Sequence, residues 1–485
     1  ALYLHQPYEF FLDHHSGSMS TQILSESQQV VTQFFTPAAN VIASSLTVLV
    51  IVLLLLWINP IVAVSAFALL GGIYGGTFTL SRRVVRRGGE IRRETNKKRY
   101  LVANEAFGGV KEIKLLGRED TYINDFRRPS ERMARTQVNV QVLSQLPQYV
   151  MQAVGFSGMI ILCLLLINTK NLAAGDALSG ILPVLGVFAF AGQRLLPELS
   201  KLYQSLTQLQ YGRAAVETVF DDLARKKPPR PLPNTRDKPL RLRQQLRLDR
   251  VSYRYPKAEA SGLHDVSLSI AAGEKIGVVG SSGAGKTTLA DVVLGLLKPS
   301  EGALVVDGVA INEKNLRAWQ QSIGYVPQYI FLTDTSVAEN IALGLPSAEI
   351  DRVQIENAGR IAQIDEFIRR ELPDGYDTIV GERGVRLSGG QRQRIGIARA
   401  LYHNADLIVF DEATSALDNV TEREVMAAID NLPGDKTVLI IAHRLSTVQR
   451  CDRILMLDKG SVAGFDSWEA LMESNDGFRK IAEVN

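Results

Sequence analysis

The stretch KIGVVGSSGAGKTTLADVVLG, Lys275–Gly295, contains an apolar run, a glycine-rich loop and the start of a helical pattern, in that order. This strand–loop–helix context is what a phosphate-binding P-loop requires. We expect the amides of Gly280–Gly285 to surround a β-phosphate, Lys286 to neutralise phosphate oxygens and Thr287 to offer its hydroxyl to Mg²⁺. A glycine-rich turn with a chance Lys-Thr pair is the alternative, which the flanking patterns disfavour. The stretch predicts an α/β nucleotide-binding domain.

Two further apolar runs end in polar residues. LIVFDEATSALD places Asp411 and Glu412 directly after a run, and TVLIIAHRLS places His443 after another. Open parallel sheets bind ligands at the carboxyl edge of their strands, so we expect these side chains to share one site. Asp411 would hold the Mg²⁺ shell, Glu412 would polarise or position a water, and His443 would contact the γ-phosphate. The alternatives are a helix N-terminal carboxylate for Glu412 and a satisfied core histidine for His443.

A second glycine-rich helix start lies in LSGGQRQRIGIARA, Leu387–Ala400. Ser388, Gly389 and Gly390 present a hydroxyl and amides at a helix N-terminus, which suits a phosphate oxygen. An ordinary N-cap serine followed by flexible glycines is the alternative. The chain therefore carries two potential phosphate cradles.

The first two hundred residues contain long apolar runs. No charged side chain occurs from residue 37 to residue 81, about twice the roughly 20 apolar residues that one membrane helix requires. Pro60 cannot continue a preceding helix, so a hairpin is expected, and a second hairpin follows later in the chain. A buried helix pair in a soluble core is the alternative. The expected membrane spans lie near residues 38–58, 61–81, 147–169 and 177–196.

The segment between the two hairpins begins with the basic run SRRVVRRGGEIRRETNKKR. The positive-inside rule places it in the cytoplasm, together with both ends of the chain. Arg82, Arg83, Arg86 and Arg87 share one helical face. They are either topology signals that also attract anionic headgroups, or guanidinium forks that hold the pyrophosphate of a substrate.

Taken together, the motifs from about Leu240 onward resemble those of ATP-binding cassette (ABC) transporters of the exporter type. The resemblance implies that Tyr255 in YRYP stacks on adenine and that Gln328 in IGYVPQ senses Mg²⁺ and the membrane domain. GERG, Gly381–Gly384, resembles the loop typical of exporters, and SALD, which ends in Asp418, matches the loop that crosses to a partner subunit.

LSGGQ matches the signature motif of this family, which binds nucleotide held by the other subunit. Two chains would then pair head to tail around two shared ATP sites. Both sites have the expected residues, which favours a homodimer, although a heterodimer with a similar chain stays open. Glu412, His443 and Gln328 are expected to be catalytic, and Thr287, Gln328 and Asp411 to serve Mg²⁺. The expected nucleotide-binding residues are Tyr255, Gly280, Ser281, Ser282, Gly283, Ala284, Gly285, Lys286, Thr287, Thr288, Ser388, Gly389, Gly390, Gln391 and Asp418.

The expected fold is an α-helical transmembrane bundle followed by an α/β P-loop domain. The expected boundaries are 1–222 for the membrane domain, 223–239 for a Pro-rich basic linker and 240–485 for the nucleotide-binding domain. Exporter half-transporters have six spans, so we expect an N-terminally truncated sequence preceded by two further spans. Cytoplasmic coupling helices are expected near 8–20 and 104–117, the second resting on the partner's nucleotide domain.

The stretches QPYEFFL and VKEIKLLGRE resemble bacterial flippases that move lipid-linked oligosaccharides across the inner membrane for protein glycosylation. This resemblance implies a multi-pass inner-membrane protein that acts on membrane lipids and polyprenyl-pyrophosphate-linked oligosaccharide. The alternatives are an exporter of peptides, lipids or drugs, and a cassette ATPase acting on DNA or ribosomes, which would lack membrane spans. A net charge of only +3 argues against a nucleic-acid-coating protein, and two cysteines are too few for a disulfide framework.

Overall fold

The computed structural model describes residues 3–13, 19, 21–58, 60–166, 177–225, 238–256, 262–381, 384, 387–413, 419–442 and 444–484. The chain divides into two compact units. One unit consists of Tyr3–Glu9 and Pro229–Asn485, and the other of Phe10–Pro228. Most of the expected linker, 226–237, lies outside the described residues.

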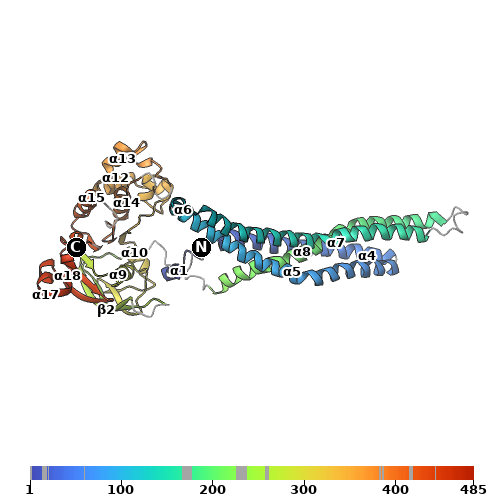
Figure 1. Cartoon of the computed structure of the whole chain (residues 1–485), viewed down its shortest axis with the longest axis horizontal. Helices are drawn as coiled ribbons and strands as arrows, with labels where there is room; N and C mark the ends of the chain where they lie inside the picture. Colours follow the sequence, from blue (N-terminus) through green and yellow to red (C-terminus); the bar gives the residue numbers. More distant parts are fainter. Residues whose placement is uncertain are drawn as a thin grey trace. The chain divides into compact units, whose positions relative to one another are not determined.

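The second unit is helical. The short helix α1 spans Tyr8–Asp13, and its first two residues belong to the first unit. The long helices are α4, α5, α7 and α8 (Figure 1). Helix α5 packs against α7 and α8, and α4 packs against α8. The bounds are η1 Thr21–Glu26, α3 Ser27–Val30, η2 Val31–Phe35, α4 Thr36–Ile58, α5 Pro60–Gly108, α6 Val110–Leu116, α7 Glu119–Leu166 and α8 Ala177–Arg225.

Within the described residues, one helical stretch, Ile23–Ile58, is apolar and long enough to cross a membrane. Each expected span lies within or overlaps one of the long helices α4, α5, α7 and α8. The other three spans remain predictions from the sequence, and residues 167–169 of the third lie outside the described part of the chain.

Gly89 allows α5 and α8 to approach each other closely beyond their apolar segments, where both helices become more polar. A Cβ atom built on Gly89 would lie 2.2 Å from the carbonyl oxygen of Tyr211. Next to this contact, Arg92 donates to Glu26 at 2.9 Å in a buried ion pair. A buried charge is tolerated only when it is paired. This ion pair therefore connects η1, which contains Glu26, to α5.

The chain bends after α5 at paired glycines. Helix α5 ends at Gly108, Gly109 is the N-cap of α6, and Gly117 closes α6 with a left-handed φ of 60°. Glycine is the residue that adopts this conformation at least cost. A short helix therefore occupies the second expected coupling region, and α1 begins the first, of which residues 14–18 and 20 lie outside the described part of the chain.

The first unit is an α/β domain with two sheets. The strands of the antiparallel sheet have the order β2-β1-β4-β5, and the six-stranded sheet has the order β10-β9-β3-β8-β7-β6. All neighbours in the larger sheet are parallel except β10 and β9. The strands are β1 Gln245–Tyr253, β2 Leu263–Ala271, β3 Lys275–Val279, β4 Glu301–Val306, β5 Val309–Ala310, β6 Ile323–Val326, β7 Leu407–Asp411, β8 Thr437–Ile441, β9 Arg453–Asp458 and β10 Ser461–Asp466.

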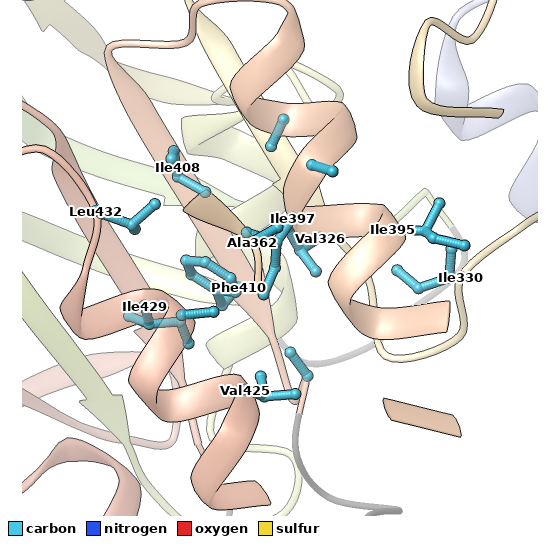
Figure 2. Close-up of a cluster of buried hydrophobic side chains, with 14 of the residues drawn as sticks. Val326, Ile330, Ala362, Ile395, Ile397, Ile408, Phe410, Val425, Ile429 and Leu432 are labelled. Carbon is cyan, nitrogen blue, oxygen red and sulfur yellow. The ribbon is translucent and has the colours of Figure 1, made fainter. Parts of the chain in front are cut away.

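Helices cover one face of the larger sheet, and the helix that follows the P-loop together with the antiparallel sheet covers the other face. Figure 2 shows Ile408 and Phe410 of β7 packed among apolar side chains that include Ile397 and Val425. The intervening Val409 belongs to the core on the opposite face. The helical elements are α9 Lys286–Val293, α10 Leu316–Gln320, α11 Val337–Ile341, η4 Ser347–Glu349, α12 Arg352–Ile361, α13 Asp365–Glu371, η5 Gly375–Asp377, α14 Gly389–Tyr402, α15 Asn419–Asp430, α16 Leu445–Val448, α17 Trp468–Ser474 and α18 Asp476–Val484.

Candidate nucleotide site

The strand order brings the expected ATP motifs to one edge of the larger sheet. Strands β3, β8, β7 and β6 are consecutive and parallel. The P-loop follows β3, Asp411 ends β7, and Gln328 lies two residues after β6. His443 follows β8 in the chain, but it lies outside the described residues, as does Asp418. Four segments that are distant in sequence therefore end at the same edge. The strand patterns predict this for β3, β7 and β8, whereas the segment of β6 was expected there only from the family resemblance.

Two glycines of the P-loop occupy positions that no other residue could fill. Gly280 has a φ of 154°, and a Cβ atom there would lie 2.4 Å from the carbonyl oxygen of Leu457. Gly285 has a φ of 102°, and its Cβ atom would lie 2.6 Å from the carbonyl oxygen of Gly262. The loop consequently folds tightly against the sheet before α9 begins. Backbone amides of such a loop at a helix N-terminus suit a phosphate.

The loop borders a pocket of about 310 Å³. The residues that line it are Tyr255, Gly262, Ser282, Gly283, Ala284, Gly285, Lys286, Thr287, Thr288 and Glu412. Eight of these ten residues were expected from the sequence to bind nucleotide, and Glu412 was expected to be catalytic. Gly262 is the one addition.

Lys286 lies inside this cradle with only 5% of its surface exposed. Its ammonium group donates to the carbonyl oxygens of Gly280 and Ser281, at 2.8 and 3.1 Å. Burial lowers the pKa of Lys286, and the negative charges of Glu412 and Asp411 oppose that shift. The ammonium group of Lys286 thus lies where a β- or γ-phosphate could contact it. Its two carbonyl acceptors are neutral, so a phosphate would bind the ammonium group more strongly and could replace them.

Glu412 has an unusual backbone conformation next to Asp411. Its φ is 51°, in the left-handed region that non-glycine residues rarely adopt, and its amide donates to the carbonyl of Ile441 at 3.0 Å. Strained backbone of this kind often accompanies functional sites. The side-chain amide of Gln328 donates to the Glu412 carboxylate at 3.2 Å. The structure thereby brings together two residues that the sequence analysis expected to be catalytic.

Asp411 is partly buried at the end of β7, next to Glu412. Burial raises its pKa, and a hydrogen bond from Tyr325 opposes this shift; the Tyr325 hydroxyl lies 3.2 Å from Oδ2 of Asp411. Asp291 of α9 is buried nearby, and burial together with the charge of Asp411 raises its pKa to about 6. Negative charge therefore accumulates at this edge, which favours a bound cation.

The residues expected to serve Mg²⁺ fit this ion. The Thr287 hydroxyl, the Asp411 carboxylate and the Gln328 amide oxygen are hard oxygen donors, which Mg²⁺ prefers. Thr287 lines the pocket beside Lys286, while Asp411 and Gln328 end or follow neighbouring strands of the sheet. When bound, the metal neutralises charge on the β- and γ-phosphate oxygens.

Tyr255 borders the pocket on its other side. Its hydroxyl lies 3.2 Å from that of Thr288, and its ring packs edge-to-face against Tyr253, with centroids 5.0 Å apart. Tyr253 is 2% exposed, and its hydroxyl donates to Oε1 of Glu9 at 2.8 Å. Glu9 belongs to the same compact unit although it lies far away in sequence. The expected adenine-stacking ring is thus supported from behind by a second tyrosine.

Ser388 begins α14 as a true N-cap. Its hydroxyl accepts from the amide of Gln391 at 3.2 Å, and the Gln391 side chain accepts from the Ser388 amide at 2.7 Å. This capping box corresponds to the alternative interpretation of the serine, and it leaves the role toward a partner's nucleotide untested. Ser388, Gly389, Gly390 and Gln391 are not among the described residues that line the pocket of their own chain.

Sequence reasoning missed two residues that organise the site. Tyr325 is the donor to Asp411, and Gln393 of α14 donates to the backbone carbonyl of Gln328 at 2.8 Å. Each lies inside a motif that was recognised for other residues. The signal for Tyr325 is a polar side chain in a short, mainly apolar strand, and the signal for Gln393 is a second glutamine in the motif that Ser388 begins.

Comparisons with known proteins match both units. Residues 263–415 match the family model described as "ABC transporter", and residues 3–188 match "ABC transporter transmembrane region". The chain is 33% identical over 479 residues to the ATP-dependent lipid A-core flippase of Cupriavidus pinatubonensis, covering 97% of this chain and 78% of that protein. It is 34% identical over 476 residues to the protein of the same name from Pseudomonas aeruginosa, covering 98% and 77%.

A solved structure agrees with these matches. The structure of a bacterial Atm1-family ABC exporter with ATP bound superimposes with a TM-score of 0.82 at 25% sequence identity, covering 100% of this chain and 83% of that one. The similarity extends over both the helical unit and the α/β unit.

Proposed function

Because the chain belongs to the ABC transporter family and has the exporter fold, we propose that it uses ATP to flip a lipid with a phosphorylated saccharide headgroup across the bacterial inner membrane. Hydrolysis of ATP with Mg²⁺ by the α/β unit is coupled to transport in this family. The substrate class is the new element of the proposal. It includes lipid A-core and polyprenyl-pyrophosphate-linked oligosaccharides, which share phosphate groups next to a sugar.

The observation that carries the substrate class is the basic face of α5. Arg82, Arg83, Arg86 and Arg87 are all exposed, whereas Val85 between them is buried. Guanidinium groups bind phosphate through paired hydrogen bonds that lysine cannot reproduce. An arginine cluster at the end of an apolar helical segment therefore suits a lipid whose headgroup carries phosphate.

The neighbouring acidic residue neutralises little of this face. Arg86 lies 3.7 Å from Glu90, and both side chains are about half exposed. Exposed ion pairs of this kind contribute between 0 and about 1 kcal/mol. A phosphate group can displace such a partner, so Arg86 stays available to a substrate.

The ATP site supplies the force in this proposal. ATP held by Lys286 and its loop would be covered by Ser388 and the adjacent glycines of a second copy of the chain. Glu412 would orient the attacking water, and Gln328 would sense Mg²⁺. Two such shared sites make the working protein a homodimer with its nucleotide-binding domains in the cytoplasm.

Two other functions have less support. An exporter of peptides or drugs would favour an apolar cavity, and the basic face of α5 does not suit such cargo. A cassette ATPase that acts on DNA or ribosomes would not need a membrane region, whereas residues 3–188 match the transmembrane region of ABC transporters.

The test replaces Arg82, Arg83, Arg86 and Arg87 with lysine in the full-length transporter, reconstituted in liposomes. ATPase activity and flipping are measured with lipid A-core, with a polyprenyl-pyrophosphate oligosaccharide and with a peptide panel. The proposal expects stimulation by one or both phosphorylated glycolipids and not by peptides. It expects the lysine variant to lose about tenfold or more in stimulated flipping while basal ATPase activity persists.

A matched control keeps charge and the number of changes constant. Arg127, Arg128, Arg132 and Arg135 of α7 are also exposed, and their replacement by lysine should leave flipping intact. Flipping that survives all four changes on α5 would reduce those arginines to topology signals. Stimulation by peptides alone would exclude the proposed substrate class.

A further inference from the structure

We infer that Tyr325 is a positioning residue of the ATP reaction, whose hydroxyl fixes the carboxylate of Asp411 for Mg²⁺. The Tyr325 hydroxyl donates to Oδ2 of Asp411 at 3.2 Å. This bond joins two strands whose residues are 86 positions apart in the chain. Oδ1 of Asp411 is not the acceptor of this bond and would be the oxygen offered to Mg²⁺.

The register of the sheet accounts for this contact. Strands β6 and β7 are parallel, and Tyr325 is paired with Val409. Side chains alternate between the two faces of a strand, so Tyr325, Val409 and Asp411 lie on one face. The next residue, Val326, is paired with Phe410, and both lie in the core on the other face. The strand register therefore places the Tyr325 side chain on the same face of the sheet as Asp411, which ends β7.

Tyr325 is not required to fill the core. Its side chain is 37% exposed, whereas its strand neighbour Val326 is fully buried. An ionised carboxylate can only accept a hydrogen bond, so the phenol of Tyr325 is the donor to Asp411. A phenylalanine would have the same volume without the hydroxyl, which isolates the hydrogen bond from packing.

Asp411 has a physical need for such a donor. Glu412 is adjacent in sequence, and Asp291 of α9 is a second, buried carboxyl group near Asp411. Repulsion between carboxyl groups at short range favours rotation of one of them away from the others. The Tyr325 hydroxyl holds Oδ2 of Asp411 through a hydrogen bond, and the ammonium group of Lys286 is a positive charge near Asp411. Lys286 also serves the phosphates, so Tyr325 is the donor dedicated to the carboxylate.

The expected effect is confined to the metal. Tyr325 is not among the described residues that line the nucleotide pocket, so its loss leaves the P-loop and the adenine side unchanged. Tyr325→Phe should weaken metal affinity by about threefold to tenfold, the range for a partly exposed hydrogen bond to a charged group. Hydrolysis should need a correspondingly higher Mg²⁺ concentration to reach half of its maximal rate, because the metal binds more weakly.

The experiment measures metal binding directly. Mn²⁺ is titrated into the purified full chain with a non-hydrolysable ATP analogue, and bound Mn²⁺ is followed by electron paramagnetic resonance. Affinity for the nucleotide in the presence of EDTA is measured in parallel. The inference expects weaker Mn²⁺ binding by Tyr325→Phe with metal-free nucleotide affinity unchanged. Unaltered Mn²⁺ affinity in a folded variant would overturn it.

Tyr376→Phe is the matched control. The Tyr376 hydroxyl also donates to a carboxylate, Oδ1 of Asp365, at 2.8 Å, but both residues lie among the helices rather than at the edge of the sheet. This variant should change thermal stability and not Mn²⁺ affinity. An equal loss of Mn²⁺ affinity in both variants would show a general structural effect and refute the inference.

A double variant tests the coupling. In an Asp411→Asn background the carboxylate is gone, so adding Tyr325→Phe should produce no further loss of Mn²⁺ affinity. A loss of the same size as in the wild-type background would mean that Tyr325 acts through another group.

Discussion

Replacing Glu412 with glutamine tests the chemical centre of the site. The change keeps the shape of the side chain and removes its negative charge. Both residues are unbranched at Cβ, so the left-handed backbone at φ 51° is retained at similar cost. The hydrogen bond between Gln328 and position 412 changes from a bond to a carboxylate into a bond to a neutral amide. The variant should therefore fold and bind ATP normally.

The size of the effect follows from the role assigned to the carboxylate. A positioned general base contributes about 10²- to 10⁴-fold to a rate, which corresponds to roughly 3 to 5.5 kcal/mol of the activation barrier. Loss of the charge-assisted bond to Gln328 costs only about 1 kcal/mol of folding or local stability. The rate effect thus exceeds the structural effect by a wide margin, and the two can be separated.

The assay is ATP hydrolysis by the purified transporter at saturating Mg²⁺ and ATP, with nucleotide affinity measured separately by a fluorescent analogue. Hydrolysis should fall by at least about 100-fold while affinity changes by less than about threefold. Glu356→Gln is the control, because Glu356 is an exposed partner of Arg369 on the helical side of the domain. Normal hydrolysis by Glu412→Gln would refute the assignment of Glu412.

Two other outcomes are expected. Mixing Ser388→Arg chains with Lys286→Ala chains should restore ATP-dependent dimer closure in mixed dimers. In such a dimer both substitutions fall at one of the two shared sites, and the other site is intact. Closure no greater than in either variant alone would refute the head-to-tail pairing. Asp291 has a pKa of about 6 in the fold against an ordinary 3.8, so the folded state binds its proton more tightly and loses stability as pH rises from about 4 through 6. Asp291→Asn should therefore raise the free energy of unfolding by about 1–2 kcal/mol above pH 6, a value discounted for partial solvation, and leave it unchanged below pH 4. Equal shifts of the thermal unfolding temperature at both pH values would contradict this.

Local motifs were predictable because their chemistry depends on neighbouring residues. The P-loop needs glycine at Gly280 and Gly285 because their backbone angles are positive and other backbone atoms leave no space for a Cβ atom. This contiguous motif therefore predicts the phosphate-binding loop without knowledge of the rest of the fold. The same holds for the uncharged stretch that becomes α4 and the start of α5, since a membrane helix depends only on length and apolarity.

The placement of Asp411 was also predictable. An apolar run that ends in an acidic residue is typical of a buried parallel strand, and the carboxyl ends of such strands share one edge. Gln328 was assigned to the ATP site only through the family resemblance, and in the structure its side chain lies 3.2 Å from that of Glu412. The roles of these residues toward water and metal remain predictions.

Contacts between distant segments were decided only by the tertiary structure. Tyr325 meets Asp411 because β6 pairs with β7 in one register, and a shift by one residue would turn the ring to the opposite face. Tyr253 meets Glu9 across 244 positions of the chain, which no local pattern could indicate. By itself, the sequence determined which residue types end each strand and begin each helix, because steric and apolar requirements act locally. Only the packed fold decided which hydroxyl reaches which carboxylate, because a hydrogen bond depends on distances of about 3 Å that strand pairing sets.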